Sequence, residues 1–168
     1  MPKKARIVCS AAAAFLLTAL AAAPYAIAQQ SADERAIEAL IGRYAQMVDR
    51  ADLKMADDLF SDAPEVTFID PLGEDHGRAR IESDLIQNLM GTTFSERQLT
   101  PKDISVHVYG DTAWSEFQWD FIAKVRKDGS PLHSQGVETQ IYRREQGRWR
   151  IVHVHYSGAV VSGNLKGY

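Results

Sequence analysis

Three short turn segments divide the C-terminal half of the chain, and they constrain its fold more than any other feature. The turns are Gly110–Asp111, 127–130 and Gln146–Gly147. They separate long segments that are rich in β-branched and aromatic residues and that alternate apolar with polar side chains. Long strands joined by tight turns pair in antiparallel fashion. The pattern therefore predicts strands at about 112–126, 133–144 and 148–161, preceded by an alternating segment around 104–109.

The N-terminal half has helical periodicity instead. An apolar stripe predicts a helix over 31–48, and weaker patterns predict helices over 52–60 and 78–90, with a short strand at 65–70 between them. Helices followed by strands indicate an α+β layer architecture. We expect a cone-shaped half-barrel, in which N-terminal helices pack in a curved, mainly antiparallel sheet and leave one central pocket. Such hollows are where small ligands usually bind.

The first residues have the organisation of a secretory signal peptide. Lys3, Lys4 and Arg6 precede an apolar run over 7–24, and Ala26-Ile27-Ala28 follows as a cleavage site. The sequence predicts a leader of residues 1–28 and a single mature domain of residues 29–168 in the periplasm or outside the cell. A retained membrane anchor is the alternative, because the run approaches the shortest span that crosses a bilayer; after cleavage no membrane association is expected.

The composition of the mature part excludes several functions. Its leader carries the chain's single cysteine, Cys9, so the mature chain has no disulfide, no thiolate nucleophile and no cysteine ligand for a metal. Removing three basic residues leaves 16 basic against 22 acidic residues, a net charge of −6 with neutral histidines. A general nucleic-acid binder needs a basic face, so we expect no nucleic-acid partner.

The C-terminal strands carry a resemblance to a known family. Residues 137–144, the Gly147-Arg148-Trp149 turn and residues 152–158 resemble the end of the association (hub) domain of calcium/calmodulin-dependent protein kinase type II. That resemblance implies a nuclear transport factor 2-like fold, shared by SnoaL-like proteins, and self-association. Nothing in the chain resembles a kinase phosphate loop, so no kinase activity is expected. The hub's pocket arginines correspond to Asp120, Gln140 and Tyr156, so a ligand of the acidic hub kind is not expected.

A second resemblance lies in the N-terminal half. Arg43-Tyr44, then 51–53, then Asp70-Pro71-Leu72-Gly73 are similar to the front of ketosteroid isomerases. The resemblance implies that Asp70 is a general base and that Tyr44 donates to a developing enolate, with Asp120 or Glu138 as a second, protonated acid. The alternatives are that Asp70 caps a turn and that Tyr44 is a core tyrosine bonded to a backbone carbonyl.

Side-chain alternation along the strands predicts which residues face the pocket. The expected pocket residues are polar and net acidic, and they would suit a hydroxylated, neutral or cationic ligand: Gln118, Asp120, Glu138, Gln140, Val154 and Tyr156.

The opposite face of the sheet is expected to be aromatic and to form at least a homodimer. The residues assigned to it are Phe117, Trp119, Phe121, Trp149, Ile151, His153 and His155. The two histidines have a spacing that can serve a metal, but no cysteine or fixed carboxylate accompanies them, so a packed or interface pair is expected, without a metal or other cofactor.

Three hypotheses about function follow. The favoured one is an exported module that binds an unidentified small molecule or oligomerises, in the manner of SnoaL-like and hub domains. The second is an isomerase or lyase that needs no cofactor and uses Asp70 and Tyr44. The third is a structural oligomer with a vestigial pocket. A fold alone does not decide between them.

Overall fold

The computed structural model describes residues 16–162, with side chains for 32–159 and for Ser162. Its helices are α1 (Leu16–Arg50), α2 (Leu53–Leu59), α3 (Arg78–Ile81) and the π-helix η1 (Glu82–Thr93). Its strands are β1 (Thr67–Asp70), β2 (Gly73–His76), β3 (Phe94–Tyr109), β4 (Thr112–Val125), β5 (Pro131–Glu145) and β6 (Arg148–Ser162). The chain divides into two units at Asp33, and the fold described below is that of the unit beginning at Glu34.

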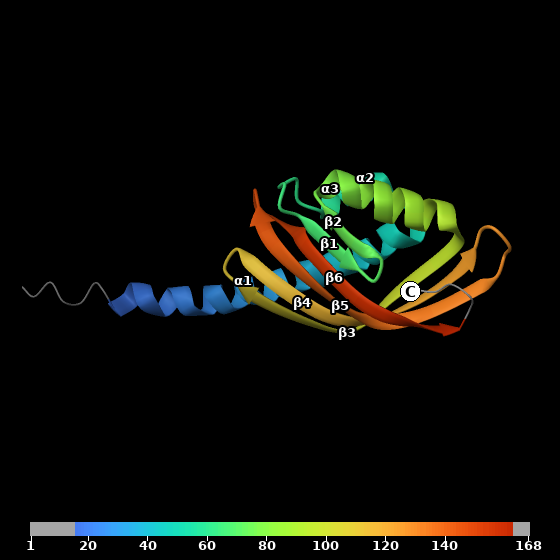
Figure 1. Cartoon of the computed structure of the whole chain (residues 1–168). Helices are drawn as coiled ribbons and strands as arrows, with labels where there is room; N and C mark the ends of the chain where they lie inside the picture. Colours follow the sequence, from blue (N-terminus) through green and yellow to red (C-terminus); the bar gives the residue numbers. More distant parts are fainter. Residues whose placement is uncertain (1–15, 163–168) are drawn as a thin grey trace, which may run out of the picture. The chain divides into compact units, whose positions relative to one another are not determined.

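The six strands form one curved, open sheet in the order β2-β1-β6-β5-β4-β3. Strands β1 and β6 run parallel and every other neighbouring pair is antiparallel, so the expected α+β class and mainly antiparallel sheet are confirmed. Figure 1 shows the meander of long strands with α2, α3 and the green η1 helix packed against one side of it. The expected helix over 78–90 is found as α3 continuing into η1, and β2 is a strand that the sequence patterns did not predict.

The core lies between the helices and the inner face of the sheet. The apolar stripe of α1 is buried there, with Ile37, Ile41, Tyr44 and Val48 each at most 2% exposed. Burial of such side chains is the main stabilising contribution to a domain of this size. The part of α1 that begins at Glu34 thus packs its apolar stripe against the curved sheet, as the periodicity predicted.

Strand β6 contains an irregularity that changes which side chains face the core. Tyr142 pairs with Ile151, but its neighbour Ile141 pairs with His153, so Val152 is an extra residue. A β-bulge of this kind resets the alternation of the strand. Trp149 and Ile151 are therefore buried in the core, which makes their expected place on the outer face wrong.

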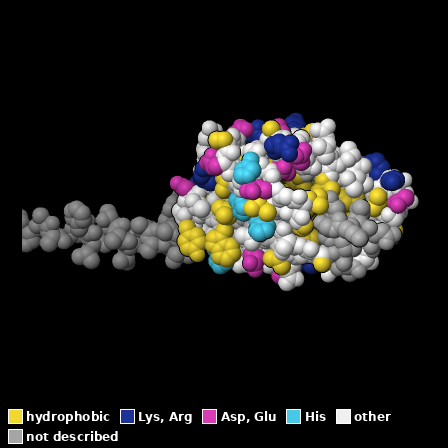
Figure 2. Space-filling model, in the orientation of Figure 1, with side chains coloured by type: hydrophobic (Ala, Val, Ile, Leu, Met, Phe, Trp, Pro, Cys, Tyr) yellow, Lys and Arg dark blue, Asp and Glu magenta, His cyan; other side chains and the backbone are white. Residues whose placement is uncertain are grey.

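The outer face of the sheet carries exposed apolar side chains. They include Tyr109, Trp114, Ile122, Val137 and Ile141. The His107 and Trp114 rings stack there with their centroids 4.3 Å apart. Figure 2 shows histidine side chains beside exposed hydrophobic side chains on the face that it displays.

One arginine ties the ends of two helices together. Arg97 donates through Nε to the Val48 and Asp49 carbonyls at the end of α1, and through Nη1 to the Met90 and Phe94 carbonyls around the end of η1. The terminal carbonyls of a helix have no partner within the helix, so this contact satisfies both ends at once. It also fixes Val48 and Met90 relative to each other.

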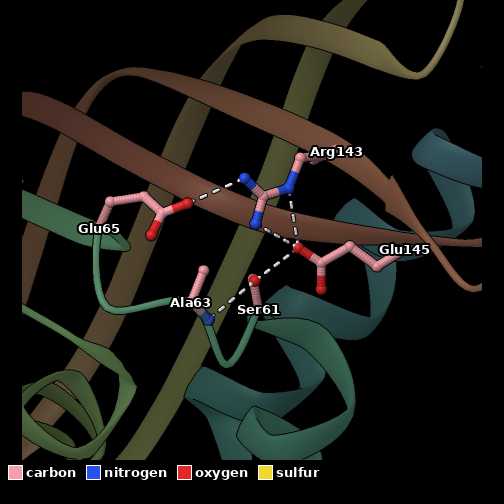
Figure 3. A network of polar contacts seen from close by, with 5 residues as sticks. All are labelled: Ser61, Ala63, Glu65, Arg143 and Glu145. Atoms are coloured by element: carbon pink, nitrogen blue, oxygen red, sulfur yellow. Dashed lines mark hydrogen bonds and ion pairs between the residues drawn. The ribbon is translucent and has the colours of Figure 1, made fainter.

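The loop between α2 and β1 is held to the end of β5 by the polar network in Figure 3. Ser61 Oγ donates to Glu145 Oε1 at 2.6 Å and accepts from the Ala63 amide at 3.1 Å. Arg143 donates to the same Glu145 oxygen through Nε and Nη2, and its Nη1 reaches Glu65 at 2.9 Å. This network positions the chain just before β1.

The basic start of the predicted leader, Lys3, Lys4 and Arg6, lies outside the described residues. Within residues 16–162, no helix combines the length and the hydropathy that a membrane span requires.

Candidate functional site

A small cavity lies between α1, η1 and the inner face of the sheet. Its free volume is about 40 Å³, measured as the space open to the centre of a water-sized sphere. The lining residues are Tyr44, Val48, Phe68, Leu85, Met90, Leu99, Trp119, Phe121, Ser134, Glu138 and Tyr156. An apolar cavity of about 150 Å³ accommodates benzene. In this conformation the cavity therefore holds a group of a few heavy atoms, and a ring requires flexible side chains such as Met90 to move.

Glu138 is the one carboxyl group on this wall. It projects from β5 and is 3% exposed. Its Oε1 accepts from Gln140 Nε2 at 2.6 Å, and its carboxyl group also shares a hydrogen bond with the Tyr44 hydroxyl from α1.

The chain of hydrogen bonds continues away from the cavity into the core. Tyr142 donates its hydroxyl proton to Gln140 Oε1 at 2.7 Å, and the Ser115 hydroxyl lies 2.7 Å from the Tyr142 oxygen. Each buried polar group in this relay thus has a partner, as a low-dielectric interior requires.

Burial keeps Glu138 protonated at neutral pH. Removal from water raises the pKa of its carboxyl group to about 8, although the hydrogen bonds from Gln140 and Tyr44 act in the opposite direction. Burial, followed by the nearby Glu138 carboxyl, also raises the pKa of Tyr44 well above its ordinary value, so the tyrosine stays neutral.

The Tyr44–Glu138 pair therefore has one proton more than its shared hydrogen bond uses. A neutral tyrosine and a protonated carboxyl group each carry one O–H donor. Only one bond joins the two groups, whichever of them donates it. The other O–H can donate to an acceptor oxygen in the cavity, which makes the pair a binding site for a carbonyl, ether or hydroxyl oxygen.

The structure brings some of the predicted site residues together and separates others. Tyr44, Glu138 and Tyr156 line the cavity, and Gln140 lies behind Glu138 as its hydrogen-bond donor. Asp70 does not line it. Asp70 ends β1, where its Oδ1 accepts from the Leu72 and Gly73 amides at 2.7 and 2.9 Å, which is the geometry of a turn cap.

Gln118 and Asp120 lie on the outer face, so their expected place in the pocket is wrong. Asp120 accepts from Gln135 there, and His133 Nε2 lies 2.6 Å from its Oδ1. These two contacts, His133 first, lower the pKa of Asp120. Without Gln118 and Asp120, the cavity wall is mostly apolar rather than polar and net acidic.

The cause is a register difference of one residue between β4 and β5. The loop after Val125 closes with the Val125 amide bonded to the Ser130 carbonyl, which pairs Lys124 with Pro131 and Phe117 with Glu138. Directly paired residues share a face, and a slip of one residue exchanges the two faces. Phe117, Trp119 and Phe121 are consequently buried, not on the outer face as expected.

Trp119, Phe121 and Ser134 are thus cavity residues that the sequence reasoning did not assign. The alternation of side-chain types along β4 indicates which of its residues face the core. The odd positions from Ala113 to Ala123 are small, aromatic or hydroxylated, whereas charged and amide side chains fill most of the even ones. Nothing comparable marks Ser134 in the sequence.

The histidine pair of β6 lies on the outer face. The rings of His153 and His155 have their centroids 6.5 Å apart, and His153 Nδ1 lies 2.6 Å from Thr67 Oγ1. Burial and the neighbouring His155 lower the pKa of His153. Among the described residues, no group of three or more His, Cys, Asp or Glu side chains has the arrangement of a metal site.

Comparison with known proteins shows the family to which the chain belongs. The profile of the SnoaL-like domain matches residues 37–162, three quarters of the chain, and the protein belongs to that family. A nuclear transport factor 2-like superfamily protein from Salmonella enterica serovar Typhimurium is 38% identical, with a TM-score of 0.75 over 82% of this chain and 99% of that one.

More distant solved structures share the fold. A protein assigned as a scytalone dehydratase from Novosphingobium aromaticivorans is 16% identical, with a TM-score of 0.71 over 81% of this chain and 91% of that one. A hexachlorocyclohexane dehydrochlorinase from Novosphingobium barchaimii is 15% identical, with a TM-score of 0.67 over 79% of this chain and 92% of that one.

Proposed function

We propose that this protein is an exported binding module for a small, mostly apolar molecule that carries an acceptor oxygen. The observation that supports it is the Tyr44–Glu138 pair, which keeps a donor proton available at the wall of an otherwise apolar cavity. Cavities of this composition bind ligands by apolar contact and orient them through a few polar groups. Glu138 and Tyr44 supply that orientation.

Binding of matched probes tests this proposal. Acetophenone carries an acceptor oxygen, whereas ethylbenzene has a similar shape and none. Glu138→Met removes the carboxyl group at similar volume, and we expect it to weaken acetophenone about tenfold, as loss of a buried hydrogen bond does. Ethylbenzene affinity should stay within about twofold. Asp120→Asn, on the outer face, is the matched control and should change neither affinity.

The pH dependence of the wild-type protein gives a test that needs no variant. Acetophenone should bind with constant affinity at neutral pH and more weakly above a pH of about 8, where Glu138 loses its proton. Ethylbenzene should show a much smaller change. Equal affinity of the two probes for wild-type and Glu138→Met protein, with the same pH profile, would contradict the proposal.

A second candidate is an enzyme of the isomerase or lyase kind. It is favoured by the convergence of Tyr44 and a protonated Glu138, since a pair of donors can stabilise an enolate. It is favoured also by the names of the dehydratase and the dehydrochlorinase that share the fold. The ketosteroid isomerase-like motif would make Asp70 the base, although its Oδ1 caps a turn in this structure.

Isomerisation of cyclohex-3-enone to the conjugated cyclohex-2-enone, followed by absorbance, tests this candidate. Asp70→Asn would abolish turnover if Asp70 were the base, whereas Glu138→Gln would reduce it. Absence of turnover by the wild-type protein, together with acetophenone binding, would support the binding module alone.

The resemblance to the hub domain suggests self-association, and we propose that at least a dimer forms through the outer face of the sheet. That face carries Trp114, which is 36% exposed, and Ile141 beside it in the register. Trp114→Glu should give monomers in native mass spectrometry. Gln87→Glu adds the same charge on the exposed side of η1 and should leave the assembly intact. A dimer that persisted in Trp114→Glu would contradict this interface.

Export is proposed from the leader motif at residues 1–28. The intact mass of protein recovered from periplasm or medium should correspond to a chain that starts at Gln29. Ala28→Arg should prevent processing, because the peptidase requires a small residue there. A mature mass that still includes residues 1–28 would favour the anchor instead.

A further inference from the structure

Two buried hydrogen-bond donors on the cavity wall have no partner among the described residues. They are Trp119 Nε1 and Ser134 Oγ, on side chains that are 6% and 1% exposed. Within the described part of the chain, the one other buried side-chain polar atom without a hydrogen bond is Glu82 Oε1, an acceptor outside the cavity that is ion-paired with Arg78 Nε at 3.2 Å. Buried polar groups are nearly always bonded, so an unpartnered pair on one wall indicates a place for a ligand atom.

The position of Trp119 is built into the sheet. Trp119 pairs with Gly136 on β5, and Gly136 pairs with Gly158 on β6, so the three residues form one row. A Cβ atom at Gly136 would lie 2.6 Å from Trp119 Cζ2, and one at Gly158 would lie 2.6 Å from Cη2. The indole therefore extends over two strands that have no side chain beneath it, and the Tyr156 ring meets it edge-on at 5.6 Å.

Ser134 lies away from the Tyr44–Glu138 pair, and Trp119 pairs with Gly136, midway between Ser134 and Glu138 on β5. Ser134 and Glu138 lie on the same face of β5, four residues apart, which corresponds to roughly 13 Å along a strand. Phe121 pairs with Ser134 at one end of this distance, and Phe117 pairs with Glu138 at the other. Gly136, under the indole, lies between them. The cavity wall therefore has separate polar positions with apolar rings around them.

The chemistry of the donors restricts what they can bind. The indole N–H only donates, and the serine hydroxyl donates as well as accepts. We propose that Trp119 and Ser134 form a second polar pole that binds an acceptor oxygen at the far end of the ligand. Resting on the proposed function, this defines the ligand class: a small molecule with an apolar, ring-sized middle and oxygen functions at both ends.

The experiment compares 4-hydroxyacetophenone, which has oxygens at both ends, with acetophenone, which has one. We expect wild-type protein to bind the two-oxygen probe about tenfold more tightly. Ser134→Ala and Trp119→Phe should each reduce that ratio to below about threefold, whatever they do to the affinity for acetophenone itself. Ser115→Ala is the matched control, because it removes a buried hydroxyl that already has Tyr142 as its partner, and it should preserve the ratio.

A spectroscopic readout on the wild-type protein does not depend on any variant folding. The three tryptophans give three indole N–H signals in a ¹H–¹⁵N spectrum. 4-Hydroxyacetophenone should shift the Trp119 signal downfield, as a new hydrogen bond does, and ethylbenzene should not. Trp114, exposed on the outer face, serves as the internal reference.

The outcomes separate the two proposals. Acetophenone binding that depends on Glu138, with an unchanged ratio in Ser134→Ala and an unshifted Trp119 signal, would overturn the second pole and leave the proposed function standing. A ratio that depends on Ser134 while Glu138→Met has no effect would overturn the proposed function instead. Failure of all probes to bind would overturn both.

Discussion

The raised pKa of Glu138 predicts a specific dependence of stability on pH. The unfolded chain has an ordinary glutamate pKa of 4.5, whereas the folded protein has about 8. Between these values the folded state holds a proton that the unfolded state has released, so the free energy of unfolding falls as pH rises. The interval corresponds to about 5 kcal/mol at 1.36 kcal/mol for each pH unit. Below the unfolded pKa the contribution of Glu138 is constant.

Glu138→Gln isolates this contribution, because glutamine keeps the size and hydrogen-bonding capacity of the side chain but does not titrate. Urea denaturation of both proteins from pH 4 to pH 9 gives the difference in unfolding free energy at each pH. All other titrating groups are shared and cancel in this difference. We expect the wild-type protein to lose several kcal/mol relative to the variant between pH 5 and pH 8, and nothing further above pH 9.

A flat difference, or a wild-type protein that gains stability relative to Glu138→Gln with rising pH, would refute the reasoning. A flat difference would mean that Glu138 has an ordinary pKa and reaches water in solution. The cavity would then lack its proton donor at neutral pH, and the proposal of an acceptor-binding pair would lose its basis.

The other contacts give three more predictions. Ser61→Ala should lower the free energy of unfolding in urea by about 1–2 kcal/mol, because a buried hydrogen bond is lost, and Arg143→Gln should cost less, since solvent screens that exposed guanidinium; the reverse order would contradict this view of the network. Asp70→Ala should lower the free energy of unfolding by about 1 kcal/mol in the same assay, because the turn cap is lost, and should leave acetophenone affinity unchanged. A loss of affinity would show that Asp70 takes part in binding. Gly158→Ala and Gly136→Ala should both lower the melting temperature, but Trp119→Leu should rescue Gly158→Ala better, because a Cβ at Gly136 overlaps the Ser157 carbonyl severely whereas one at Gly158 lies 2.8 Å from the Gln135 carbonyl; equal rescue would contradict the placement of the indole over the two glycines.

The fold could be predicted from the sequence because its signals are local. The stripe of α1 and the three turns are each specified within a few residues, and both resemblances pointed to the same half-barrel. The placement of Tyr44 and Glu138 inside followed from the same patterns. The sequence patterns did not predict the features that depend on contacts between residues far apart in the chain. The register of β4 against β5 depends on how the loop after Val125 closes, and the bulge at Val152 is visible only from the pairing.

The consequence of that register was chemical as well as structural. A pocket lined by Gln118 and Asp120 would attract a cation, whereas the observed wall attracts an uncharged molecule. The ketosteroid isomerase resemblance implied that Tyr44 acts with a second, protonated acid, either Asp120 or Glu138, and of these two only Glu138 lies at the cavity wall. The hydrogen bond between Tyr44 and Glu138 across α1 and β5 could not be inferred from spacing, because the residues are far apart in the sequence.

Protonation of Glu138 also links ligand binding to stability. The donor proton of the pair is present only while Glu138 is protonated, so an acceptor ligand binds that form and raises the pKa of the carboxyl group further. A ligand that binds the folded state alone also stabilises it. The ligand does not change the pKa of the unfolded chain, so the fall in unfolding free energy should still begin near pH 4.5 but should continue to a higher pH when the cavity is occupied. A donor-only indole on the same wall favours the same kind of ligand atom, since neither Trp119 nor protonated Glu138 needs a donor. Burying Glu138 lowers stability near neutral pH. In return, the buried carboxyl group keeps a proton that it can donate to a ligand in the cavity.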